Sequence, residues 1–151
     1  MPVPGSPPRV EYRGRTREVL VQLVRATCPS DLDALGLTDD VVRAVEDALV
    51  YAPPLFSKAL GLGLLALDAA SVVDGGGTAF SRMPLDRARA YVEGTHLGPN
   101  VPRVAVIPQV RLLALMGYFE QTAVQERMGY DPAAWIAKVK KERLERHADD
   151  L

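Results

Sequence analysis

Residues 55–73 (LFSKALGLGLLALDAASVV) form a long apolar segment that follows two prolines and ends before Asp74 and three glycines. A membrane span needs about 20 nearly charge-free residues, whereas this segment contains Lys58 and Asp68. We therefore expect a buried central helix rather than a membrane span. Pro54 suits its first position, where the missing N–H needs no partner. Gly61 and Gly63 would let a neighbouring helix approach closely.

The rest of the chain repeats this pattern of apolar runs at helical spacing, separated by proline, glycine or capping residues. One helix is expected from residue 16 to the residues before Pro29, and another over residues 39–50 after a Thr38 cap. A further helix should run from Pro84 onward, followed by one over residues 101–121 with a kink or break at Pro108. Two more are expected, over residues 123–128 before Gly129 and after the Asp131 and Pro132 pair. Sustained period-two alternation is missing. The sequence predicts an all-α fold, a compact bundle of about six helices. Residues 1–15 would be a flexible Pro-rich N-terminal arm and residues 16–148 a single helical domain.

Composition limits the classes of partner. With 151 residues, 48% of them hydrophobic, the chain can bury one sizeable core. A net charge of −1 gives no overall attraction to nucleic acid or to an anionic membrane. The single cysteine, Cys28, excludes an internal disulfide and is expected as a core residue in a reducing compartment. Because the N-terminus lacks the apolar run of a secretory signal, we expect a cytoplasmic protein.

Residues that could carry chemistry are sparse. His96 and His147 have no cysteine or carboxylate at metal-ligand spacing, and the glycine-rich stretches lack the pattern of a phosphate loop. Ser57, Ser71 and Ser81 have no histidine near in sequence, which is weak evidence because catalytic triads assemble in space. We therefore expect no metal, no cofactor and no catalytic group in this chain. The charged C-terminal segment KVKKERLER is expected to be a solvated helix, anchored through its first turns by Trp135, Ile136 and Val139.

Aromatic residues gather near the segment GYFEQTAVQERMGYDP, residues 117–132. Tyr and Trp combine a large apolar area with a polar group and are favoured as interface anchors. The candidate partner-binding residues are Tyr118, Phe119, Tyr130 and Trp135. For each of them, an ordinary place in the core is the equal alternative.

The same segment carries a resemblance to a known family. The order F-x-x-M-P, an arginine-bearing helix, and then RLLALMGYF-x-x-T-x-V-x-x-x-MGYDP resembles the gluconate 2-dehydrogenase subunit 3 family. The similarity covers roughly residues 16–132, and a related segment occurs in fused long-chain alcohol oxidases. Thr122 stands where the family usually has proline, and the twin-arginine export signal of many relatives is missing.

The resemblance implies a non-catalytic small subunit that binds and stabilises a large FAD-dependent oxidoreductase of the glucose-methanol-choline type, acting on alcohols, sugars or sterols. FAD and the chemistry would belong to the partner, so the functional unit would be a hetero-oligomer. Placement at the membrane surface, or export together with the partner, stays open. The alternative function is that of a free-standing helical interaction or regulatory domain.

Overall fold

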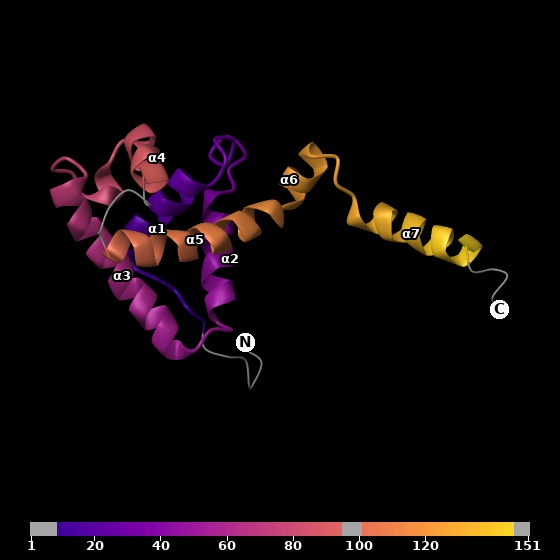
Figure 1. Cartoon of the computed structure of the whole chain (residues 1–151), viewed down its shortest axis with the longest axis horizontal. Helices are drawn as coiled ribbons and strands as arrows, with labels where there is room; N and C mark the ends of the chain where they lie inside the picture. Colours follow the sequence, from indigo (N-terminus) through magenta and orange to yellow (C-terminus); the bar gives the residue numbers. More distant parts are fainter. Residues whose placement is uncertain (1–8, 95–100, 147–151) are drawn as a thin grey trace. The chain divides into compact units, whose positions relative to one another are not determined.

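A computed structural model describes residues 9–94 and 101–146, and within them all regular structure is helical (Figure 1). The elements are α1 (Gly14–Thr27), α2 (Thr38–Leu49), α3 (Pro54–Asp74), a 3₁₀ turn η1 (Phe80–Arg82), α4 (Leu85–Glu93), α5 (Val101–Phe119), α6 (Thr122–Arg127) and α7 (Pro132–Arg146). The predicted all-α fold is confirmed. Its helices begin and end within a few residues of the positions expected from the sequence.

The first helix forms the centre of the core. α1 packs against α2, α3, α4 and the η1 turn. Its apolar residues Val19, Leu20, Leu23 and Val24 recur at intervals of one or three positions and are fully buried. This spacing places them on one side of a helix with 3.6 residues per turn, so that α1 presents a continuous apolar face to its neighbours.

Several local signals act as predicted. Pro54 is the first residue of α3, and Gly129 follows α6 with a φ of 68° that favours glycine. The Asp131 carboxylate accepts a 3.0 Å hydrogen bond from the backbone N–H of Ala134, which caps α7. The expected Thr38 cap is wrong, because the Thr38 hydroxyl donates to an Asp33 carboxylate oxygen at 2.7 Å and caps no backbone amide of α2.

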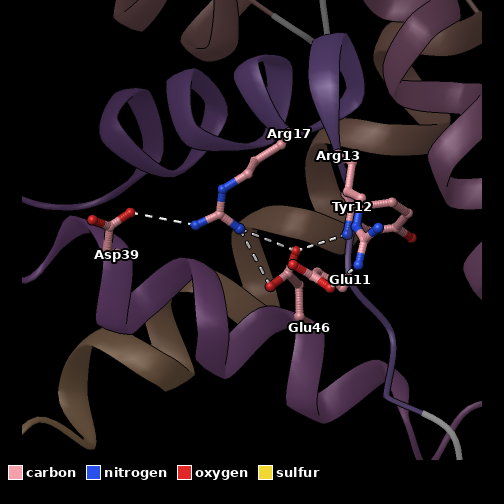
Figure 2. A network of polar contacts seen from close by, with 6 residues as sticks. All are labelled: Glu11, Tyr12, Arg13, Arg17, Asp39 and Glu46. Carbon is pink, nitrogen blue, oxygen red and sulfur yellow. Dashed lines mark hydrogen bonds and ion pairs between the residues drawn. The ribbon is translucent and has the colours of Figure 1, made fainter.

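The N-terminal segment differs from the predicted arm. Residues 1–8 lie outside the described part of the chain, but Tyr12 is anchored at both ends: its N–H donates to Glu46 at 2.9 Å and its hydroxyl donates to the Ser57 carbonyl at 2.6 Å. Arg17 reaches Glu46 and Asp39 in the same network (Figure 2). Burial, with the Glu46 charge, raises the pKa of Tyr12 to about 12. The expected arm was too long because the prolines end at position 8, whereas the residues that follow have partners on α2 and α3.

The third helix, predicted as a buried central helix, is buried on one side only. On the inner side, the Asp68 carboxylate accepts from the Arg15 guanidinium at 2.7 Å and from the Ser81 N–H at 2.8 Å. Burial alone would raise the pKa of Asp68, but these hydrogen bonds outweigh it and hold the pKa below its usual value. Among the described residues, α3 is the one helix long and apolar enough to cross a bilayer, a weak indication because core helices meet the same criteria.

Gly63 allows α5 to approach α3 closely, as predicted, whereas Gly61 makes room for Tyr12, which precedes α1. A Cβ on Gly63 would lie 2.7 Å from a methyl carbon of Val106, and one on Gly61 would lie 2.9 Å from the Tyr12 ring. Pro108 lies inside α5, which continues through it as one helix and is not divided there. The missing N–H of Pro108 is tolerated on the exposed side of α5.

The contacts divide the chain between Tyr118 and Phe119 into two compact units, whereas the sequence predicted a single domain over residues 16–148. In the second unit, α7 has no buried residue. Within this unit Trp135 and Ile136 are exposed, and the predicted anchoring of α7 through Trp135, Ile136 and Val139 stays a prediction. Its charged residues pair along the helix surface, from Lys138 to Glu142 at 3.9 Å and from Lys141 to Glu145 at 3.8 Å, which agrees with the predicted solvated helix.

Candidate docking surface

The four aromatic candidates divide into one core residue and three exposed ones. Tyr118 is only 3% exposed, and its hydroxyl donates to the Asp31 carboxylate at 2.7 Å. Its ring is therefore part of the packed interior of this chain, which is the alternative that the sequence left open for each candidate. Phe119 is 46% exposed, and Tyr130 and Trp135 are also exposed. A role in partner binding stays a prediction for these three.

Residues with reactive side chains are engaged in the core. The Cys28 thiol is buried, 3.7 Å from the Ala114 carbonyl oxygen, and burial raises its pKa to about 11. It is therefore protonated at neutral pH, as expected for a core cysteine. The Ser71 hydroxyl donates to the Asp68 carbonyl at 2.8 Å. Within the described ranges no three His, Cys, Asp or Glu side chains come close enough to hold a metal; His96 and His147 lie outside these ranges.

The outer side of α3 is apolar along its whole length. The exposed residues at intervals of four and three positions form what we call the α3 seam: Leu55, Ala59, Leu62, Ala66, Ala69 and Val73. The spacing is that of the contact positions of packed helices. Among the exposed positions of residues 55–73, Lys58 is the only charged one. A helix face of this kind is unfavourable in water and favourable against another apolar surface.

The outer side of α5 carries a second apolar row. We call it the α5 stripe, and it consists of Val101, Ala105, Pro108, Leu112 and Met116, all of them exposed. The sequence of α5 is apolar on nearly every side, which predicts that the helix is covered by its own fold or by a partner. Within the first unit its inner residues Val106, Ile107 and Val110 are buried, while the α5 stripe is left uncovered. The described residues of the first unit therefore cover only one side of α5.

A groove of about 330 Å³ lies between α3 and α5. Its walls are Phe56, Ala59, Leu60, Gly63 and Ala66 from α3, and Val101, Pro102, Ala105, Val106 and Gln109 from α5. Gln109 supplies the only side chain with a polar group in this lining. The groove joins the α3 seam to the α5 stripe, so the two helices together present an apolar surface with very few polar groups. Such a surface offers apolar burial and a defined shape to a partner.

Comparisons with family models, with curated proteins and with solved structures find no match to this chain. Sequence reasoning missed the α3 seam because the whole of residues 55–73 was assigned to the core. A signal for it was present: Leu55, Leu62 and Val73 lie on the side of the helix opposite Leu60 and Leu64.

Proposed function

We propose that this chain is a non-catalytic helical subunit that binds a larger protein through the α5 stripe and the adjoining groove. The observation that carries the proposal is the α5 stripe itself. Five apolar side chains follow one another along the outside of a 19-residue helix. Contiguous exposed apolar surface of this kind is typical of protein interaction sites.

The proposed partner is a large FAD-dependent oxidoreductase of the alcohol, sugar or sterol type. Support comes from the resemblance of residues 117–132 to the small-subunit family, in which the partner holds the flavin. Phe119 and Tyr130 from that segment are exposed and available to the partner as aromatic anchors. In this proposal FAD and the reacting groups belong to the partner, and this chain contributes stability and shape to a hetero-oligomer.

The second candidate is a free-standing interaction domain that uses the same surface without a flavoprotein. Purification from the native source separates the two. A tagged chain that brings down a yellow protein of larger mass in a stoichiometric amount supports the flavoprotein partner. A colourless complex, or turnover of an alcohol or sugar by the isolated chain, would contradict it.

Replacing Leu112 by glutamate tests the surface directly. Leu112 is 60% exposed, so the change should leave helix content unaltered while placing a charge in the interface. We expect affinity for the partner to fall at least tenfold, since single anchors are often worth about 2 kcal/mol. The matched control is Leu62→Glu, the same change at a 71% exposed position on α3 outside the groove lining. Equal affinity of the Leu112 variant and the wild type would refute the proposed surface.

A further inference from the structure

We propose that Arg103 is a positioning residue of the docking surface: it holds the start of α5 folded in the wall of the groove, so that this part of the helix can take part in partner binding. We call residues 101–105 the α5 leading turn. The effect on the partner rests on the proposed function, whereas the contacts of Arg103 lie within the first unit of this chain. The Arg103 side chain is 14% exposed and lies outside the α5 stripe.

The α5 leading turn forms part of the surface but has no buried residue to hold it. Val101, Pro102 and Ala105 line the groove, and Val101 and Ala105 also begin the α5 stripe. Each residue of this turn is exposed or half-buried, and burial along α5 begins with Val106 and Ile107. Apolar packing therefore fixes α5 from Val106 onward and leaves the leading turn to other contacts.

The sequence of the leading turn, VPRVA, gives the helix little support of its own. The β-branched side chains of Val101 and Val104 lower the helix propensity. An arginine at this end of a helix opposes the helix dipole, whose N-terminal end is positive. Pro102 is tolerated because its missing N–H needs no partner here. A stable leading turn therefore needs a favourable contact that offsets these effects.

Arg103 makes that contact with the ends of two other helices. Its Nη2 and Nε atoms donate to the Tyr91 carbonyl oxygen near the end of α4, at 2.5 and 3.2 Å. Its guanidinium carbon lies 4.0 Å from the centre of the Tyr91 ring, within the range of cation–π attraction. Its Nη1 atom lies 3.8 Å from a carboxylate oxygen of Asp74, the last residue of α3. One side chain thus ties the start of α5 to both α3 and α4.

The groups that receive the guanidinium are themselves held in place. The Tyr91 hydroxyl donates to the other carboxylate oxygen of Asp74 at 2.8 Å, and the Tyr91 ring centre lies 5.7 Å from that of Phe80. Burial, with Asp74, raises the pKa of Tyr91, so its hydroxyl remains a donor at neutral pH. Because Tyr91 and Phe80 are buried, the guanidinium meets a preformed site rather than mobile surface groups.

Hydrogen exchange of the full chain, with no partner present, tests the contact. When the leading turn unwinds, the amides of Ala105, Val106 and Ile107 lose their helical acceptors, the carbonyls four residues earlier. For Arg103→Met we expect these amides to exchange about tenfold faster or more, while the amides beyond Pro108 keep their wild-type rates. An equal increase throughout α5 would indicate a general loss of stability and would overturn the proposal. Unchanged rates at the three amides would overturn it as well.

Two further variants serve as controls. Arg103→Lys keeps the charge but not the flat group that stacks on Tyr91 and donates through two nitrogens, so its rates should lie between those of the wild type and Arg103→Met. Arg111→Met makes the same change at an exposed arginine of α5 and should leave all rates at their wild-type values. If Arg111→Met accelerated the same amides as Arg103→Met, the effect would come from lost charge in general, and the proposal would be wrong.

Affinity for the larger protein recovered with the tagged chain tests the effect on docking. We expect Arg103→Met to weaken this binding about threefold or more, because only chains with a folded leading turn present the complete surface. If Leu112→Glu weakens binding and Arg103→Met does not, the positioning role is refuted and the docking surface stands. If neither variant weakens binding, the docking surface is refuted, whereas faster exchange confined to the leading turn of Arg103→Met still supports Arg103 as the residue that holds it.

Discussion

Replacing Gly117 by alanine tests the contact between α5 and α2. A Cβ at Gly117 would lie 2.8 Å from the Cβ of Ala44, whereas carbon atoms prefer about 3.5–4.0 Å. Alanine gains about 1 kcal/mol in helix propensity over glycine, but overpacking of this size costs about 1–3 kcal/mol. We therefore expect a net loss of about 1 kcal/mol in the free energy of unfolding. The neighbouring atom is on a short side chain, so only movement of the backbone can relieve the overlap.

The reverse change at Ala44 provides a matched control. Ala44→Gly alone should cost about 1 kcal/mol, because it places a glycine inside α2. In the double variant the missing Cβ of Ala44 makes room for the new Cβ at Gly117, and the two propensity changes cancel. We expect the double variant to be close to the wild type, a coupling of about 2 kcal/mol between the sites.

Urea unfolding followed by far-ultraviolet circular dichroism measures all four proteins. Similar slopes of free energy against urea would show that the variants unfold from equally compact states. Additive effects of the two substitutions, or a Gly117→Ala variant more stable than the wild type by about 1 kcal/mol, would refute the reasoning. Either result would mean that α5 can move away from α2 at little cost, and that the α5 stripe is not held at a fixed position.

Two further predictions concern buried polar groups. Asp68→Asn should lower the free energy of unfolding at pH 7 by about 1–3 kcal/mol, because the Arg15 and Ser81 donors lose their charged acceptor. Since the folded pKa of Asp68 is below its usual value, this contribution is present above about pH 4 and disappears as the pH falls through the folded pKa. Urea unfolding should therefore show a smaller difference in the free energy of unfolding between wild type and variant at pH 3 than at pH 7. Tyr118→Phe should cost about 1–2 kcal/mol through the lost hydrogen bond to Asp31 and leave partner affinity unchanged. Weaker partner binding by a Tyr118→Phe protein of normal stability would restore this residue to the docking surface.

Helix ends were predictable because their causes are local. Pro54 begins α3 because its missing N–H needs no partner at the first position of a helix. Gly129 follows α6 because glycine readily adopts the positive φ found there. Both effects act within a few residues of the chain. The Asp131 cap on α7 is local in the same way. Thr38 was the exception, because Asp33 competes for its hydroxyl.

The direction of each side chain was less predictable. Tyr118 and Phe119 are neighbours of similar size, yet one is buried and the other exposed. A single step along a helix turns the side chain by about 100°, and which direction meets the core depends on where Asp31 lies in space. For the same reason the two apolar sides of α3 could not be assigned to core and surface from the sequence. That assignment depends on α1 and on Arg15, 53 positions away from Asp68.

The central position of α1 has a consequence for synthesis. This helix is made first among the described ones, but its neighbours α2, α3, η1 and α4 end only with Glu93. At roughly 5–20 residues per second, the ribosome needs about 3–13 s to add the chain between Thr27 and Glu93. During that time Leu20, Leu23 and their neighbours lack the surfaces that later bury them. The nascent chain therefore passes through an interval in which the apolar face of α1, the helix made earliest, is open to chaperones.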